Sequence, residues 1–448
     1  MSRAVITILG TIGVPREGQE RAKYYFSDNL KDDFSLKREN YTNMLPLLVD
    51  NFKDEIVSIY TQTSKSRQEE VLVYEELVYD IEKNGFFVSE KSQDVEADYG
   101  YLLNGINTIM EKYDSVIIDM SHGFRHFPIL AIINLIIQNI KNPKKVEFIL
   151  FAKEIVPFKE YEIIDLKEYL ELANLSFMLS TFNQNYTVSN NIRFRNPLYK
   201  EIAKELAEFS NHFLSNSLKP LVEGKLIEDI IDNLEELQKD KSVENFKHYI
   251  DDIVLHLEEI RQLKYQSEWE KFYEISKVMD KRGYQLNAIT LLFEAVGFYC
   301  LESLSHIERV GKRVDEYYGF IEQKRRPEHI YSTYTMTNQI RTLVKIQSRF
   351  HVSDERLFIG NESLKNIIIR YLDDVDKINQ FTRFLQDLEA LRNNLAHGNT
   401  SISIENVKRS YQSYLSKFKD LCIDKDIFST AKEFDKITPI DRLNNKWH

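Results

Sequence analysis

The sequence of 448 residues contains only two cysteines, Cys300 and Cys422. Two cysteines cannot form a disulfide framework or a structural zinc site, so we expect a reducing, cytoplasmic environment. No apolar run reaches the roughly 20 residues that span a membrane, and we therefore expect no membrane segment. The N-terminus lacks a basic segment followed by a cleavage site, and residues 4–9 instead predict a first strand.

Several catalytic motifs are also missing from the sequence. It has no H-E-x-x-H zinc motif, no phosphate-binding P-loop and no G-x-S-x-G nucleophile elbow. A complete G-x-G-x-x-G is absent too, which argues against a dinucleotide cofactor. We therefore expect no catalytic metal and no cofactor that is required for catalysis.

The charge is unevenly distributed along the chain. The formal net charge is −11, which argues against a nucleic-acid partner for the chain as a whole. Residues 1–280 carry about −15 of this charge, whereas residues 281–448 carry about +4. The local basic excess permits a polyanion site in the C-terminal part.

Apolar segments of strand length alternate with helical patterns up to about residue 175. This alternation predicts βαβ units and a mostly parallel, Rossmann-like sheet, with a long loop or hairpin insertion at residues 13–40. From about residue 166 the periodicity is helical, apart from a polar stretch at 314–333. The strands are expected at residues 4–9, 55–61, 86–89, 115–119 and 145–151.

The periodicity and the charge together suggest three domains. We expect an α/β domain at residues 1–175, an acidic all-α connector at 176–280 and an all-α domain at 281–448.

The segment from Ser115 to Arg125 combines a short apolar strand with a polar turn, and an apolar helical run follows from Ile129. In an open α/β sheet, ligands bind at the carboxyl ends of the strands, and a helix that begins there offers backbone N–H groups to an anion. The turn carries more recognition chemistry than a connector needs. The candidate ligand-binding residues are Ser121, His122, Gly123, Phe124 and Arg125.

Two other strand ends are polar. Gly10 and Thr11 follow the first strand, where the glycine permits a close approach of ligand to backbone and the threonine offers a hydroxyl. Because the first and fourth strands are often neighbours in a doubly wound sheet, we expect this turn and the Ser121 turn to face one crevice. Residues 61–64 could add contacts. Alone, Gly10 and Thr11 are better explained as an ordinary βα turn.

The segment Arg392-Asn393-Asn394-Leu395-Ala396-His397 closes an amphipathic helix, and Gly398 is a natural residue to end it. Imidazole is the usual general acid or base, and arginine binds phosphoryl oxygens. Residues five apart on an ideal helix point about 140° apart. A site therefore needs a distorted helix end or two copies that meet across a two-fold axis. The alternative is a capping histidine and a surface arginine.

The two motifs together carry a family resemblance. Residues Asp119 to Arg125 with Pro128 resemble the D-x-T-H-G-F-R-x-x-P signature of the CRISPR-associated DxTHG family, and Arg392 to His397 resembles the R-x4-H signature of HEPN ribonucleases. The resemblance extends to residues 9–11, 44–48 and 163–166. The chain thus looks like a CARF–HEPN ribonuclease of type III CRISPR defence.

This resemblance implies a CARF domain that senses a cyclic oligoadenylate, with tetra- or hexa-adenylate as the activator. It also implies a homodimer or higher oligomer whose HEPN domains cut single-stranded RNA without a metal and leave 2′,3′-cyclic phosphate ends. Arg392 would hold the scissile phosphate, His397 would act as general acid and base, and Asn393 would orient the site. The activator site would be lined by Gly10, Thr11, Ser121, His122, Gly123, Phe124 and Arg125.

Two departures from the family pattern stand out. Ser121 replaces the usual threonine but keeps the hydroxyl. After the fifth predicted strand, relatives show an aromatic residue followed by glycine and a small residue, whereas this sequence has Phe151-Ala152-Lys153. A ligand contact that the family makes with this loop is therefore in doubt. Lys153 could bind a phosphate instead.

Two other functions agree with the same residues. One is a non-enzymatic nucleotide-sensing regulator or interaction protein whose helical half binds a partner. The other is a sensor domain that also cleaves its cyclic activator, because Ser121, His122 and Arg125 suit binding and cleavage alike.

Overall fold

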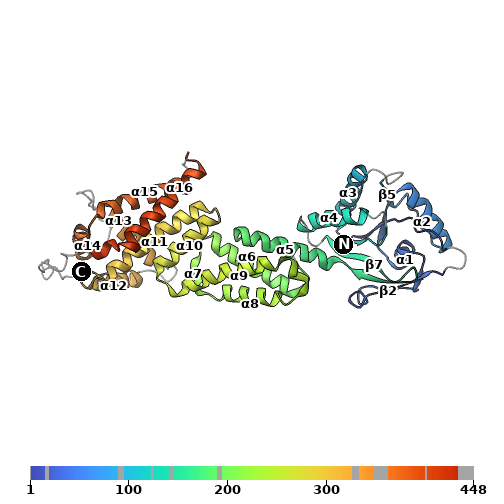
Figure 1. Ribbon diagram of the computed structural model, residues 1–448, viewed down its shortest axis with the longest axis horizontal. Coiled ribbons are helices and arrows are strands. Elements are labelled where there is room, and N and C mark those ends of the chain that lie inside the picture. Colours follow the sequence, from blue (N-terminus) through green and yellow to red (C-terminus); the bar gives the residue numbers. More distant parts are fainter. Residues whose placement is uncertain are drawn as a thin grey trace. The chain divides into compact units, whose positions relative to one another are not determined.

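The computed structural model describes residues 2–15, 20–88, 95–122, 126–141, 145–188, 194–324, 332–346, 362–398 and 401–431. The chain folds into two compact units, whose elements are labelled in Figure 1. Unit 1 comprises Met1–Asn183, Thr187–Ala207 and Asp232–Asp252. Unit 2 comprises Gln184–Tyr186, Glu208–Ile231 and Ile253–His448. Residues 176–280 are thus shared between the units, and the domain boundaries at 175 and 280 stay predictions.

An eight-stranded sheet in the order β3-β2-β8-β7-β6-β1-β4-β5 forms the centre of unit 1. Strands β5, β4, β1, β6 and β7 are mutually parallel, which confirms the mostly parallel sheet. Strand β8 is antiparallel to β7 and parallel to β2, while β3 is antiparallel to β2. The strands are β1 Arg3–Ile8, β2 Ala22–Phe26, β3 Asn40–Tyr41, β4 Glu55–Tyr60, β5 Gly85–Phe87, β6 Ser115–Asp119, β7 Val146–Val156 and β8 Glu160–Asp165.

Helices cover both faces of this sheet. Ala4, Ile6 and Ile8 of β1 belong to a core shared with α3 (Val95–Lys112) and α4 (His126–Lys141). Val5 points to the other core, which includes α1 (Met44–Asn51). Helix α2 (Gln62–Tyr74) adds Leu72 to a third cluster with Leu9 and Leu45. Both faces of β1 and β6 are buried, as expected for central parallel strands.

The sequence prediction differs from the fold mainly at one edge of the sheet. Residues 13–40 include β2, which pairs with β8, and residues 160–165 form β8 itself. These strands were missed because they are short and half-buried: the buried residues of β2 alternate with exposed or partly exposed ones. Helix α2 begins at Gln62, because Thr61 and Ser64 form a capping box at its start.

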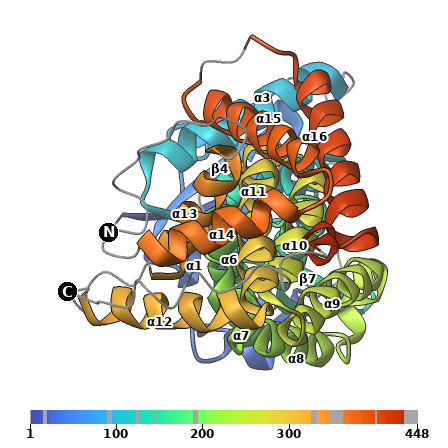
Figure 2. The ribbon, with the colours of Figure 1, turned by 90° about the vertical axis from the view of Figure 1, so that its left-hand side faces the viewer.

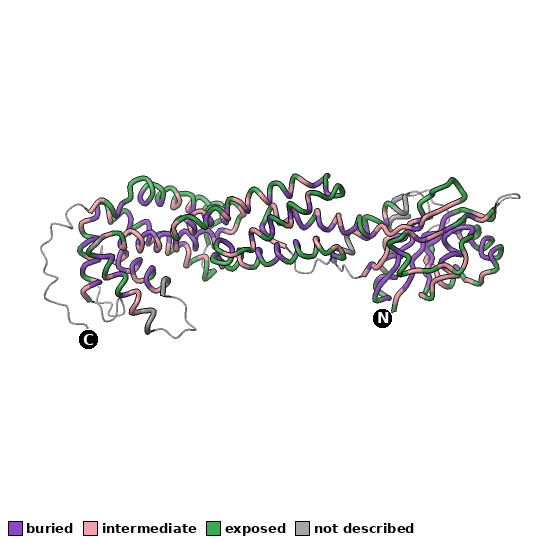
Figure 3. The backbone as a smooth tube through the Cα atoms, turned by 90° about the horizontal axis from the view of Figure 1, so that it is seen from below, coloured by how far each residue is buried: buried purple, intermediate pink, exposed green. Residues whose placement is uncertain are grey.

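Helices α5 to α9 contribute to both units. Buried and exposed residues alternate along them, as the burial colours of Figure 3 show. Most of the buried positions are apolar, and most of the acidic residues are not buried. They are α5 Lys167–Asn185, α6 Pro197–Leu214, α7 Leu218–Glu223, α8 Leu226–Leu237 and α9 Lys247–Gln262.

Helix α11 (Gln285–Ser305) forms the centre of unit 2 (Figure 2). Helices α10, α12, α13, α15 and α16 all contact it. By length and composition α11 could cross a membrane, contrary to the expectation from the sequence, but 61% of its apolar window is buried by its neighbours. The helices around it are α10 Glu268–Lys281, α12 Glu308–Lys324, α13 Ser332–Ile346, α14 Glu362–Asp374, α15 Ile378–Ala396 and α16 Ile404–Phe418.

Helix α12 occupies much of the stretch that was predicted to be irregular. Its sequence is polar on average, yet Val310, Val314 and Tyr317 recur at helical spacing and are buried. A helix that is this polar overall is recognisable only by the spacing of its few apolar residues.

Lys167, the first residue of α5, is buried at the junction of sheet and helix. Its Nζ donates a hydrogen bond to the carbonyl oxygen of Val146 at 2.5 Å. Burial, reinforced by the positive charge of Arg195, lowers the pKa of the Lys167 amine from 10.5 to about 8.

This pKa predicts that Lys167 destabilises the fold near neutral pH. Between about pH 8 and pH 10.5 the unfolded chain binds the proton that the folded amine has lost, so stability rises with pH across this window. We compare the melting temperatures of the wild type and of Lys167→Met at each pH. The difference, wild type minus variant, should rise between pH 7.5 and pH 9.5. A difference that stays constant or falls, measured by thermal unfolding of the full chain, contradicts the assignment.

Candidate functional site

The first part of the candidate site lies at the carboxyl ends of β1 and β6. These strands pair in parallel, with Thr7 opposite Asp119, which confirms that the first and fourth predicted strands are neighbours. The Gly10 turn and the Ser121 turn therefore leave the sheet at the same edge.

Asp119 is fully buried at this edge and its carboxylate holds the two turns together. One oxygen, Oδ2, accepts a hydrogen bond from the Thr7 hydroxyl at 2.7 Å. The other, Oδ1, accepts from the backbone N–H of Ser121 at 3.0 Å and from its hydroxyl at 2.6 Å. A buried carboxylate is stable only with such partners, so both oxygens are committed to structure.

The Ser121 hydroxyl has a second partner on the next strand. It accepts a hydrogen bond from the backbone N–H of Ala152 in β7 at 2.8 Å while it donates to Asp119. One hydroxyl thus links the end of β6 to the middle of β7. Ser121 was predicted to line the activator site, and its position at this edge agrees, but its side chain is occupied by the turn itself.

His122 lies directly after this network. Its Nε2 accepts a hydrogen bond from the backbone N–H of Met44, at the start of α1, at 3.3 Å. Nε2 is then unprotonated and Nδ1 carries the hydrogen. Burial lowers the pKa of His122, while the negative charge of Asp119 opposes the shift. The imidazole is therefore neutral at neutral pH.

Two residues that sequence reasoning missed fix the Gly10 turn. The Gln68 amide donates to the carbonyl oxygens of Gly10 and Ile12, each at 3.0 Å, and accepts from the Asn43 amide, also at 3.0 Å. Gly10 is buried, whereas Thr11 is exposed. Asn43 was detectable as an N-cap before α1, and its side chain indeed accepts from the N–H of Leu45. No local pattern marks Gln68.

The remaining candidates at this edge have different outcomes. Gly123, Phe124 and Arg125 lie outside the described residues. Lys153 points to Glu162, 3.9 Å away. Of residues 61–64, which were expected to add ligand contacts, Thr61 and Ser64 are engaged in the cap of α2, whereas Gln62 and Thr63 are exposed.

The second part of the candidate site is the C-terminal end of α15, in unit 2. Gly398 has a φ of +66°, which places it in the left-handed conformation expected of the residue that ends a helix. His397 is the exposed C-cap residue, and its backbone N–H still bonds to Asn393. Arg392 is half-buried, and its Nη1 donates to Asn393 Oδ1 at 2.9 Å.

Arg392 is supported by an aromatic residue of α11. Its guanidinium carbon lies over the ring of Phe293, 5.6 Å from the centroid. The guanidinium carbon of Arg341, which is 1% exposed, lies over the same ring at 4.1 Å. Arg341 also donates to Glu294 Oε2 at 2.8 Å, which offsets its charge. Sequence reasoning missed Phe293 and Arg341 because Phe293 contacts Arg392, and Arg341 contacts Phe293, across long stretches of the sequence.

Each of the two parts is assembled within one unit. Thr7, Gly10, Asp119, Ser121 and His122 meet at the sheet edge, and Arg392, Asn393 and His397 share the end of one helix. Within the described ranges, no three or more His, Cys, Asp or Glu side chains are placed to hold a metal ion.

Comparisons with known proteins give one named structure. The chain is similar to Enterococcus italicus Csm6 bound to cyclic hexa-2'-fluoro-hexa-dAMP, with 14% identity and a TM-score of 0.28 over 97% of this chain and 99% of that chain. No protein-family model and no curated protein matches the sequence. The function proposed below rests on the residues of this chain and not on that likeness.

The network around Asp119 predicts that Ser121 is needed for stability. Ser121→Ala leaves the buried Ala152 N–H without its acceptor and removes one donor from Asp119, at a cost of about 1–3 kcal/mol. Ser121→Thr keeps the hydroxyl and should lose less than about 0.5 kcal/mol. Chemical denaturation of the full chain measures both variants. Wild-type stability in Ser121→Ala would show that the hydroxyl is free for another role.

Proposed function

We propose that the chain is an endoribonuclease of type III CRISPR defence, activated by a cyclic oligoadenylate. The observation that carries the proposal is the end of α15, where a half-buried arginine bonded to a side-chain amide is followed, five residues after the arginine, by an exposed histidine. The polar sheet edge of unit 1 supplies a separate place for a regulatory ligand. The buried free thiols of Cys300 and Cys422 suit a reducing cytoplasm.

The proposed reaction uses the substrate's own nucleophile. The 2′-hydroxyl of the RNA attacks the adjacent phosphorus, its proton passes to an imidazole, and the bond to the 5′-oxygen of the next nucleotide breaks. That oxygen takes a proton from an imidazolium, which leaves a 2′,3′-cyclic phosphate and a 5′-hydroxyl. His397 supplies the imidazole, Arg392 stabilises the phosphoryl oxygens, and Asn393 orients the guanidinium. These groups suffice without a metal.

The proposed active form contains two copies of the chain. Arg392 and His397 diverge on one helix, so two helix ends across a two-fold axis supply a complete set. Beside this end, the side chains of Ile402 and Ile404 are 45% and 56% exposed. In unit 1, α4 exposes Ile129 and Ile133. Exposed apolar side chains of this kind are what a second copy would cover.

The proposed activator is cyclic tetra- or hexa-adenylate bound at the sheet edge. Thr11 offers an exposed hydroxyl, the Gly10 turn permits close approach, and Arg125 is the proposed phosphate contact. A two-fold symmetric ring matches two copies of this edge. Ligand binding would then change the packing of the helices that carry Arg392.

The geometry favours recognition of the activator over its cleavage. The Ser121 hydroxyl is held by Asp119 and Ala152, and His122 Nε2 is bonded to the Met44 N–H. A nucleophile or base needs these atoms free. The purely regulatory alternative has no use for the Arg392 and His397 pair.

The proposal predicts RNA cleavage that depends on the activator. Single-stranded RNA should be cut when cyclic tetra- or hexa-adenylate is added, in the presence of EDTA, with 2′,3′-cyclic phosphate ends. Arg392→Ala and His397→Ala should each lower the rate by at least about 10³-fold. Exposed Glu316→Gln serves as the matched control. Binding of RNA without cleavage, or full activity of either variant, contradicts the catalytic assignment.

Phe293 is proposed as a positioning residue for Arg392. Phe293→Leu removes the aromatic face under the guanidinium and should lower kcat about tenfold with little change in KM, because the arginine loses its orientation. Phe293→Tyr keeps the face and should restore most of kcat. Steady-state cleavage kinetics separate the two effects. Equal losses in both variants would indicate that Phe293 contributes packing alone.

A further inference from the structure

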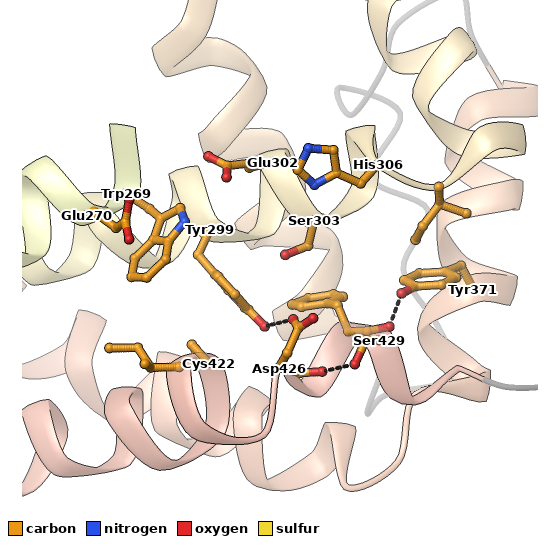
Figure 4. A pocket seen from close by; sticks show the side chains of 13 residues that line it. Trp269, Glu270, Tyr299, Glu302, Ser303, His306, Tyr371, Cys422, Asp426 and Ser429 are labelled. Atoms are coloured by element: carbon orange, nitrogen blue, oxygen red, sulfur yellow. Dashed lines mark hydrogen bonds between the residues drawn. The ribbon is translucent and has the colours of Figure 1, made fainter. Parts of the chain in front are cut away.

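Unit 2 contains a cavity of about 440 Å³ that the proposed nuclease chemistry does not use. It is lined by residues of α10, the C-terminal half of α11, α14 and the segment that follows α16 (Figure 4). Its volume lies in the range of small-molecule sites. Tyr299 in the cavity wall contacts Phe381, which lies in the first turn of α15. Arg392 lies 11 residues after Phe381, which is about 16 Å along the axis of the same helix, so the cavity is separate from the end of α15.

Aromatic rings form one continuous wall of this cavity. Trp269 packs against Tyr299 with 5.9 Å between ring centroids, and Tyr299 packs against Phe428 at 5.6 Å. Phe428 in turn stacks on Tyr371 at 6.2 Å. The faces of such rings attract cations, and indole attracts them most strongly.

Three carboxylates complete the lining, and none of the described residues that line it is a lysine or an arginine. Asp426 is held in place by the Tyr299 hydroxyl, which donates to its Oδ1 at 2.8 Å. Glu270 accepts from the backbone N–H of Ser267 at 2.9 Å and from its hydroxyl at 2.8 Å. The nearest lysine in sequence, Lys425, is paired with Asp420 at 2.8 Å.

Glu302 is the carboxylate whose negative charge is disfavoured by its surroundings. Burial raises its pKa, and the negative charges of Glu270 and Glu268 add to the shift, while His306 and a hydrogen bond from Trp269 oppose it. A positive charge inside the cavity would relieve this repulsion. Figure 4 shows Glu302 and His306 above the cavity, with Trp269 beside it and Asp426 below.

The lining also restricts the class of ligand. Phosphate-bearing ligands are disfavoured, because the three carboxylates outnumber His306, which is the one basic side chain among the described residues of the lining. The acidic and histidine side chains of the described residues do not converge into a metal-binding group. The class of ligand that fits the lining is an organic cation with two or more positive charges. Its charges would lie far enough apart to pair with separate carboxylates, and the carbon chain between them would pack against the aromatic wall.

We infer that this cavity binds an aliphatic oligoamine, with ammonium groups at Glu302 and Asp426 and methylene groups against Trp269 and Tyr299. The site is distinct from the end of α15, and the inference does not depend on the proposed ribonuclease activity.

Trp269 allows a direct test, because the sequence has only one other tryptophan, Trp447. In the full chain carrying Trp447→Phe, titration with spermidine should change the Trp269 fluorescence in a saturable way with one site per chain. The double variant Glu302→Gln, Asp426→Asn should weaken the apparent Kd by at least about tenfold. Calorimetry of the unmutated chain with spermidine should give the same Kd.

Two controls make the outcome decisive. Glu316→Gln removes an exposed carboxylate of α12 and should leave the Kd unchanged. Glu302→Gln alone resembles the protonated form that burial already favours, so it should fold normally and still weaken binding. The inference is overturned if spermidine gives no saturable signal at millimolar concentration, if the cavity variants bind as well as wild type, or if magnesium chloride at equal ionic strength reproduces the effect.

Discussion

The buried carboxylate of Asp119 is the constraint on which the candidate ligand-binding edge of the sheet depends. A fully buried charge at the end of a central strand must be hydrogen-bonded on both oxygens, and the available donors come from β1 and from the turn after β6. Through Ser121 the same network reaches Ala152 in β7. The ends of β1 and β6 and the adjoining part of β7 are therefore fixed relative to one another.

This network divides the polar residues of the edge into two groups. Thr7, Asp119 and Ser121 use their side chains to hold the turns, while Thr11 remains exposed. His122 belongs partly to each group, because its Nε2 accepts a hydrogen bond from the Met44 N–H while no described residue provides such a partner for its Nδ1. At the end of α15 the division is similar: Phe293 and Arg341 form the buried support, and Arg392 and His397 stand nearer the surface. In both places, buried side chains orient a small number of accessible ones.

The sequence predicted whatever depends on local pattern. Apolar runs identified β1, β4 and β6, and the glycine after His397 identified the end of α15. Residues with distant partners were not predictable. Gln68 contacts Gly10 across 58 positions, Arg341 reaches Glu294 across 47, and neither lies in a local motif. For the same reason the sequence showed Ser121 as a free hydroxyl, although its acceptor role toward Ala152 exists only once the sheet has formed.

The most direct measurement of the central claim is the stoichiometry with which the full chain binds cyclic oligoadenylates. Isothermal titration calorimetry with cyclic tetra- and hexa-adenylate should show that one of the two rings binds tightly, with one ring for every two chains, because a symmetric ring would bridge two copies of the Asp119 edge. Absence of binding by both rings, or one ring for each chain, would contradict a sensor site shared across a two-fold axis.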